Sequence, residues 1–184
     1  MSDHDLDAEL VERARQGDAE AFGTLVAQYQ RLLTSVAFGI AGDPGKTEDL
    51  VQDAFLAAWR ALPQYRGEAS FKNWLCRILV NKSYSALRWA GLRKWLSLDH
   101  PQAAAVPDGS PEADPEGMRL RSERSQAVRE AVAGLPPQQR TAVALRASGL
   151  DVAEVARAMG VAEGTVKAHL HQARARLAEV LEIR

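Results

Sequence analysis

The sequence predicts an all-α protein, because helix signals recur along the chain while strand signals are nearly absent. No hairpin dipeptide separates alternating runs, and β-branched residues form no cluster of useful length. The 184 residues are 46% hydrophobic and 26% charged, which is enough apolar material for a packed core. We therefore expect two small helical domains, over 1–96 and 119–184, joined by a flexible acidic linker over 97–118.

The first domain divides into four predicted helices. Asp7, Asp18, Thr47 and Ser70 are suitable N-cap residues, since their side-chain oxygens accept hydrogen bonds from free backbone N–H groups. Pro63 ends the third helix. The predicted helices cover about 7–17, 18–41, 47–62 and 70–91.

The linker stands out by composition. Residues 97–117 hold four of the eight prolines and no basic residue, which is typical of an extended tether. Because so little apolar surface is available to anchor it, we expect the two domains to move independently in the free protein.

The second domain contains a helix-turn-helix pattern. Glu154 completes a capping box with Asp151, and Gly160 separates the helix that they begin from the next one. On that last helix Val166 and Ala173 face the core, whereas small and hydrogen-bonding residues are flanked by cations on the other side. This arrangement suits the major groove of DNA, and the alternative is a plain surface helix. The predicted helices cover about 118–133, 138–148, 151–159 and 163–181.

Charge is strongly segregated along the chain, although the net charge is only −1. The segments 1–59, 60–96, 97–118 and 119–184 carry −7, +7, −5 and +4, respectively. Two basic blocks indicate two surfaces that bind polyanions. Ordinary solvated helix faces are the alternative.

Two further helix faces are unusual. On the helix over 70–91, amides and arginines share one face, which fits single-stranded or distorted nucleic acid, although many amphipathic helices look alike. On the helix over 47–62, Leu56 lies inside an acidic stripe and Trp59 at its edge. An apolar residue in that setting indicates a protein-binding patch, unless it is a stray exposed leucine.

The sequence also excludes several function classes. The chain has no nucleophile-elbow, phosphate-loop or zinc-protease motif, and its single cysteine, Cys76, has no histidine next to it. The spacing of His169 and His171 does not suit a metal site on a helix. The acidic N-terminus lacks a signal-peptide core, and no apolar run is long enough to span a membrane. We expect a cytoplasmic protein that is not an enzyme and has no catalytic residue, metal, cofactor or small-molecule substrate.

The ordered segments resemble bacterial RNA polymerase sigma factors of the extracytoplasmic-function (ECF) subfamily. The residues that carry this resemblance are LVERARQGDAEAFGTLVAQYQ, EDLVQDAFLAAWRAL, YRGEASFKNWLCRILVNKSYSALR and, after LPPQQRTAVALRASGL, GTVKAHLHQARARL. The resemblance implies a transcription initiation factor of the stress-response type that brings core RNA polymerase to promoters and helps to open the DNA. It also implies region 2 over 1–96 and region 4 over 119–184.

The resemblance further implies roles for individual residues. Core polymerase would be bound, on its largest subunit, by Asp49, Gln52, Asp53, Leu56 and Trp59. The −10 element would be bound by Gly67, Glu68, Ala69, Ser70, Asn73, Arg77, Asn81 and Arg88. The −35 element would be bound by Thr165, Lys167, Ala168, His171, Gln172, Arg174 and Arg176. Region 4 would also contact the second-largest subunit, and an anti-sigma factor is an expected partner.

The chain departs from the family pattern at one place. Ala168, His169 and Gln172 replace a hydroxyl residue and two arginines, which should weaken phosphate anchoring and bears on which −35 sequence is read. A LuxR-type regulator is the alternative, since TVKAHL fits its helix-turn-helix, but residues 1–96 lack the strand–helix alternation of a receiver domain. A helical interaction module that binds no DNA is the other alternative.

Overall fold

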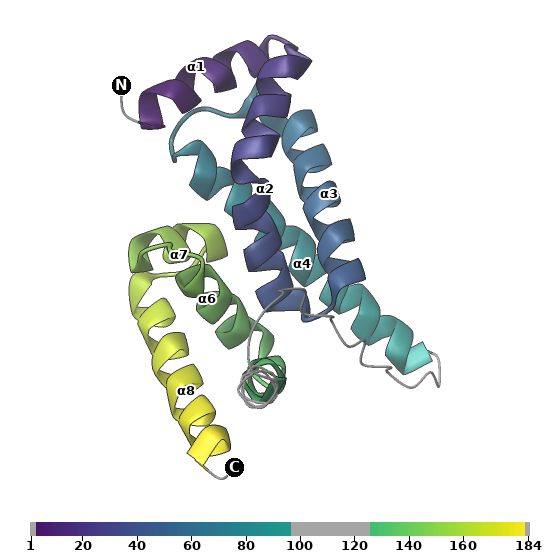
Figure 1. Cartoon of the computed structure of the whole chain (residues 1–184), viewed down its shortest axis with the longest axis vertical. Helices are drawn as coiled ribbons and strands as arrows, with labels where there is room; N and C mark the ends of the chain where they lie inside the picture. Colours follow the sequence, from purple (N-terminus) through teal and green to yellow (C-terminus); the bar gives the residue numbers. More distant parts are fainter. Residues whose placement is uncertain (1–2, 97–125, 183–184) are drawn as a thin grey trace, which may run out of the picture.

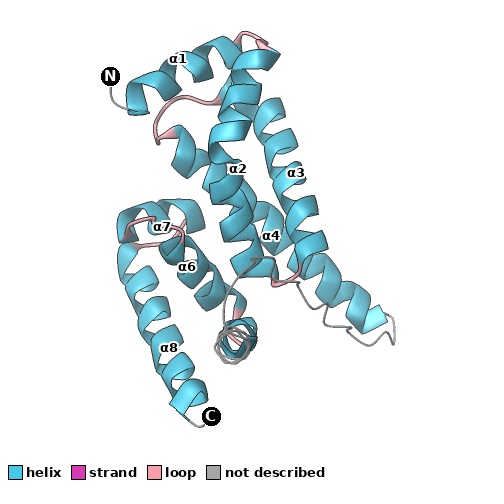
Figure 2. Cartoon of the chain, in the orientation of Figure 1, coloured by secondary structure: helices cyan, strands magenta, loops and turns pink. Residues whose placement is uncertain are grey.

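The computed structural model describes residues 3–96 and 126–182, and every regular element within them is helical (Figure 2). Residues 126–133 form one helical segment. The other elements are α1 (Asp3–Arg15), α2 (Ala19–Ala41), α3 (Pro44–Ala61), the 3-10 helix η1 (Leu62–Gln64), α4 (Phe71–Leu96), α6 (Pro137–Ala147), α7 (Val152–Met159) and α8 (Glu163–Glu182). The all-α prediction is confirmed. The predicted acidic linker, 97–118, lies outside the described residues.

Three of the predicted helix starts are confirmed in atomic detail. Asp18 Oδ1 accepts hydrogen bonds from the backbone N–H groups of the first turn of α2, both at 3.0 Å. The N–H of Asn73 donates to Ser70 Oγ at 3.3 Å. Asp151 and Glu154 form the complete capping box, with bonds of 2.7 and 2.8 Å. These polar side chains satisfy backbone donors that have no partner within the helix.

Other predicted boundaries are wrong. Asp7 is not a cap, because α1 already begins at Asp3. Helix α3 begins at Pro44, and its N-cap is Asp43, not Thr47. Proline is favoured at the first helical position, where a missing N–H costs nothing, so the helix starts earlier than the hydroxyl suggested. Helix α4 continues to Leu96, since an interior glycine lowers helix stability without ending the helix.

Helix α2 is the central element of the first domain. It contacts α1, α3 and α4, and α3 also packs on α4 (Figure 1). Leu25, Leu33 and Ile40 of α2 are buried in the same core as Leu75 and Leu79 of α4. The domain therefore presents the outer faces of α3 and α4 for other contacts.

In the second domain, α6, α7 and α8 pack against one another. Val155 of α7 and Val166 of α8 are fully buried, as is Ala173, about two turns further along α8. The predicted apolar stripe of α8 is thus confirmed. Gly160, between α7 and α8, has a left-handed φ of 68°, which permits the tight turn of the helix-turn-helix.

The two domains pack against each other, with α6 alongside α2 and α7 alongside α4 (Figure 1). Ser35 and Ser148 share a hydrogen bond of 3.0 Å between their hydroxyl oxygens across this interface. Lys72 of α4 forms an ion pair with Glu154 of α7. Buried residues from both domains belong to one continuous hydrophobic cluster.

This packing differs from the expectation of two independent domains. The linker composition suggested separation, but in the part of the chain that the structure describes, buried helix faces of the two domains are in contact. Ala142, Ala144 and Leu145 of α6 are nearly inaccessible to solvent. Small residues at such a crossing let two helices approach closely, so the interface gains dispersion energy as a core does.

Candidate partner and nucleic-acid interfaces

The outer face of α3 is an acidic surface with one apolar residue at its centre. Leu56 is 53% exposed. Asp49, Gln52 and Asp53, one or two turns before it, are also exposed. An exposed large apolar side chain surrounded by carboxylates is suited to a partner that offers both an apolar pocket and cations.

Trp59, at the edge of this surface, is partly buried. Its ring packs on Phe22 of α2, with ring centroids 4.9 Å apart. The indole is therefore held in place by the first domain, and only part of it is available to a partner. Of the five predicted residues, the structure brings four together as a free surface and makes Trp59 partly structural.

The loop between η1 and α4 is braced by aromatic packing. Tyr65 lies 4.9 Å from Trp74 and 6.1 Å from Phe71, measured between ring centroids. The Tyr65 hydroxyl donates to the carbonyl oxygen of Ala69, and burial raises the pKa of this phenol. Because Tyr65 is anchored at both ends, the loop holds Gly67 and Glu68 outward in solvent. Gly67 has a φ of 73°, a left-handed backbone conformation that residues with a Cβ atom rarely adopt.

The polar face of α4 is only partly as predicted. Arg77, Asn81 and Arg88 are exposed. Asn73 is instead 5% exposed, and its Oδ1 has no hydrogen-bond partner among the described residues. Helix α7 packs on α4 at this turn, where Lys72, next to Asn73, pairs with Glu154 of α7.

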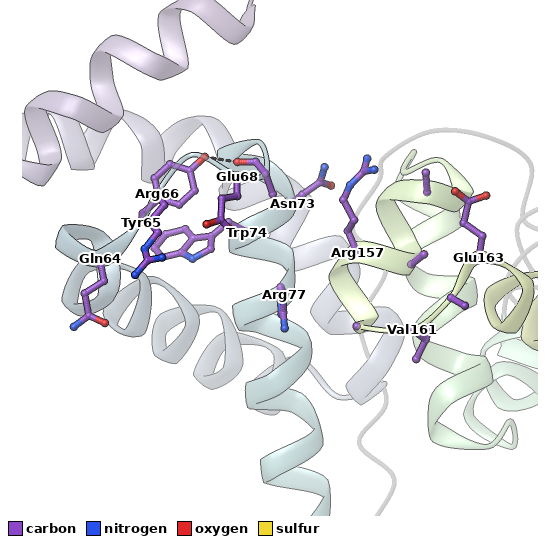
Figure 3. A pocket seen from close by; sticks show the side chains of 15 residues that line it. Gln64, Tyr65, Arg66, Glu68, Asn73, Trp74, Arg77, Arg157, Val161 and Glu163 are labelled. Atoms are coloured by element: carbon purple, nitrogen blue, oxygen red, sulfur yellow. Dashed lines mark hydrogen bonds between the residues drawn. The ribbon is translucent and has the colours of Figure 1, made fainter.

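A cleft of about 680 Å³ separates this loop and α4 from the helix-turn-helix (Figure 3). Tyr65, Trp74 and Arg77 line one wall, and Arg157 and Glu163 line the other. Arg157 was not singled out from the sequence, because its helix offers no periodic signal for a residue that faces another domain. Two aromatic rings beside several guanidinium groups form a chemically suitable surface for nucleobases and phosphates.

The outward face of α8 agrees closely with the prediction. All seven predicted residues are exposed: Thr165, Lys167, Ala168, His171, Gln172, Arg174 and Arg176. Polar and small residues thus occupy the middle of a surface whose cations lie at its margins. Such a helix, presented by a helix-turn-helix, can place base-reading groups in a major groove and cations on the phosphates.

A second groove, of about 800 Å³, lies between α4 and the α6–α8 pair. Asn81 and Arg88 line one side, and His169 and Gln172 line the other. Residues predicted to contact two different DNA elements are therefore brought together in one groove. Gln139 also lines this groove. The sequence did not predict its burial, because helix periodicity identifies buried apolar residues and not a buried glutamine.

Cys76 lines neither groove and is buried in the hydrophobic cluster that both domains share. Burial raises the pKa of its thiol to about 12, so that the thiol stays protonated and unreactive at neutral pH. Within the described residues, no helix is both long and apolar enough to cross a membrane.

Helix α7, the turn at Gly160 and the basic helix α8 place the second domain in the class of helix-turn-helix proteins. Comparison with known families then assigns both domains of the chain to one family. Residues 25–92 match the family model for Sigma-70 region 2, and residues 125–177 match the model for Sigma-70 region 4. The ECF RNA polymerase sigma-E factor of Escherichia coli strain K12 is 36% identical over 179 residues, or 95% of this chain and 93% of that protein. The RNA polymerase sigma-H factor of Pseudomonas aeruginosa is 32% identical over 187 residues, covering 99% and 97%.

Solved structures agree. RpoE of Bartonella quintana in complex with the anti-sigma factor NepR has a TM-score of 0.73 at 28% identity, over 90% of this chain and 99% of that one. CnrH in complex with the cytosolic domain of CnrY has a TM-score of 0.71 at 27% identity, over 97% and 98%. The chain belongs to the ECF RNA polymerase sigma factors, which are transcription initiation factors. The LuxR-type alternative is not favoured, because the first domain matches region 2.

Proposed function

We propose that this chain binds core RNA polymerase through region 2, within 1–96, and directs it to promoters with both domains. Region 4, within 119–184, contacts the −35 element, and the loop and polar face of region 2 contact the −10 element. The single observation that carries this proposal is the pairing of an exposed acidic stripe around Leu56 with two separate basic surfaces in a chain of the sigma family.

The polymerase-binding surface is the acidic stripe of α3, formed by Asp49, Gln52, Asp53 and Leu56 with the exposed part of Trp59. The exposure of Leu56 in the folded protein supports this role, because the free energy falls when a partner covers an apolar side chain that was in contact with water. The partner surface is on the largest subunit. The second-largest subunit contacts region 4.

The −10 element is opened and held by the braced loop, Gly67–Ser70, and by α4. Exposed Arg77, Asn81 and Arg88 contact the phosphates and bases of the separated strand, and Asn73 joins them once α7 no longer covers it. The rigid aromatic support beneath the loop favours this role, because a preorganised loop loses little conformational entropy on capturing a base.

The −35 element is read by α8 in the major groove. Gln172, Ala168 and His171 face the base edges, whereas Lys167, Arg174 and Arg176 contact phosphates, with Thr165 at the start of the helix. Helix α8 carries fewer arginines than the family pattern, because His169 and Gln172 stand in place of two of them. The base-facing residues of α8 therefore determine a larger share of the sequence specificity.

The packed arrangement of the two domains is a closed state that opens before promoter binding. The −35 and −10 elements are named for positions about 25 base pairs apart. Because about 10 base pairs of B-form DNA span about 34 Å, this separation is about 85 Å. Residues assigned to the two elements line a single groove of about 800 Å³ in this structure. One duplex cannot reach both sets at once, so the domains have to separate when polymerase binds.

An anti-sigma factor is the proposed regulator, and the cytoplasm is the proposed location. Two of the solved relatives are complexes with the anti-sigma factor NepR and with the cytosolic domain of CnrY. Comparable coverage of both chains supports a similar partner for this one.

Run-off transcription with core polymerase tests the proposal. The full chain is added to core enzyme on the promoter of its own gene and on a template whose −10 and −35 elements are scrambled. We expect a discrete transcript that requires the chain and the intact elements. Equal transcription from both templates, or none from a panel of promoters recognised by related factors, would contradict the proposal.

A further inference from the structure

Gln139 is a buried polar residue that touches a proposed base reader. It lies on α6, is 6% exposed, and belongs to the contact between α6 and α8. Its Nε2 donates a hydrogen bond of 2.9 Å to Oε1 of Gln172. The bond joins a side chain fixed in the interior to one at the exposed surface of the recognition helix.

The polarity of this bond follows from the cost of burying polar atoms. As oriented, Gln139 leaves only its Oε1 without a hydrogen-bond partner among the described residues. The opposite orientation of its amide would place both N–H groups of Nε2 in the interior without acceptors. A buried group that loses its hydrogen bonds to water is costly. The orientation that keeps one N–H bonded to Gln172 and leaves one acceptor unpaired is therefore favoured over one that leaves both N–H groups unpaired.

The consequence for Gln172 concerns which atoms it can offer to DNA. A free glutamine pairs with adenine by accepting from N6 and donating to N7 at the same time. When Gln139 occupies Oε1 and turns it toward α6, the N–H group of Gln172 that lies opposite to this oxygen points away from α6 and can donate to DNA. Guanine presents two acceptors in the major groove, N7 and O6, whereas adenine presents one acceptor and one donor.

We propose that Gln139 is a positioning residue for −35 recognition, and that it makes Gln172 a hydrogen-bond donor that selects guanine over adenine. The inference rests on the proposed function, since it assigns a preference to the same recognition helix. Gln139 itself touches no DNA and acts only through the amide of Gln172.

The test uses transcription by core polymerase with the full chain, from a promoter library randomised through the −35 region and read by sequencing. Gln172→Ala first identifies the base position that Gln172 reads. Gln139→Met removes the bond at nearly constant volume. Gln139→Glu keeps an acceptor and no donor, which turns the amide of Gln172 around and frees its Oε1. Gln138→Met, at the exposed neighbouring position of α6, is the matched control.

We expect the wild type to prefer guanine at that position, and Gln138→Met to retain this preference. In Gln139→Met, the ratio of transcription from promoters with guanine to that from promoters with adenine at this position should fall about tenfold. This change lies within the discrimination that a bidentate base contact provides. Gln139→Glu should shift the preference further toward bases that present an amino donor. In the Gln172→Ala background, neither substitution at Gln139 should alter base preference, because the residue through which they act is gone.

Three outcomes would overturn the inference. If Gln172→Ala relaxes one position but Gln139→Met leaves the preference there unchanged, Gln139 does not position the reader, although the proposed function stands. If Gln139→Met depresses all library members equally, its role is structural. If Gln172→Ala changes no position while run-off transcription still depends on intact promoter elements, Gln172 is not a reader. Gln139→Glu places a carboxylate in the interior, so circular dichroism accompanies each variant and Gln139→Met alone is sufficient for the decision.

Discussion

A Cβ atom added to Gly39 of α2 would lie 2.6 Å from the Cβ of Ala144 of α6, so these two residues set how closely the domains approach. Real Cβ atoms essentially never come so near, and the Cα of Ala144 would lie only 3.3 Å away. The absence of a side chain at Gly39 is thus a condition for the closed state. The closed state in turn covers Asn73 and places both proposed DNA-binding surfaces along one groove.

Gly39→Ala should therefore open the protein. The new methyl group overpacks the α2–α6 crossing, which costs about 1–3 kcal/mol in a well-packed site. We expect a larger radius of gyration by small-angle scattering and faster association with core polymerase. Gly23→Ala is the matched control, since it lies on the same helix and nothing lies within 4 Å of its added Cβ. That control should gain about 0.5–1 kcal/mol of helix stability and stay compact. Equal compactness of both variants would show that the crossing tolerates the methyl group.

Glu154→Gln should loosen the same interface by an electrostatic route. The substitution removes the charge that faces Lys72, while a glutamine can still close the capping box with Asp151. The expected loss of docking free energy is about 1 kcal/mol or less, because Lys72 remains partly solvated. Protection of the α4–α7 contact from hydrogen exchange should decrease, and the difference from the wild type should shrink at high salt. A salt-independent difference would assign the effect to capping.

Leu56→Asp should weaken binding to core polymerase while leaving the fold intact. Leu56 is 53% exposed, and exposed substitutions of this kind usually change stability by less than about 0.5 kcal/mol. Asp53→Arg should act in the same direction by reversing one charge of the stripe. Binding to core enzyme is measured by titration, and thermal unfolding serves as the fold control. Lys46→Ala, at an exposed position in the first turn of α3, should bind normally. Native unfolding behaviour with unchanged affinity in both stripe variants would refute the assignment.

Gln172→Ala and Lys167→Ala should have different effects on promoter use. Loss of a base contact relaxes one position and costs about 1–3 kcal/mol, whereas loss of a phosphate contact weakens all sequences alike and lowers the salt slope by about one. Transcription from a library of −35 variants at two salt concentrations separates these cases. Uniform loss in both variants would mean that Gln172 does not read a base.

The sequence by itself determined the all-helical fold, several of the helix starts and most of the exposed residues on the helices. Asp18, and the box of Asp151 with Glu154, mark helix starts through bonds to backbone groups within the next turn, so local sequence is sufficient to predict them. The spacing of Val166 and Ala173 likewise predicts the buried stripe of α8, because helix periodicity is a local property. The exposed acidic stripe around Leu56 follows from the same periodicity.

Only the tertiary structure decided the contacts between residues far apart in the chain. Asp7 accepts hydrogen bonds from Gln28 and Tyr29, not from the start of its own helix. The approach of Gly39 to Ala144, the burial of Asn73 and the bond between Gln139 and Gln172 all depend on how completed helices pack together. Such contacts depend on side-chain shape and on the balance of desolvation against hydrogen bonding at one crossing, and neither quantity leaves a periodic trace in the sequence.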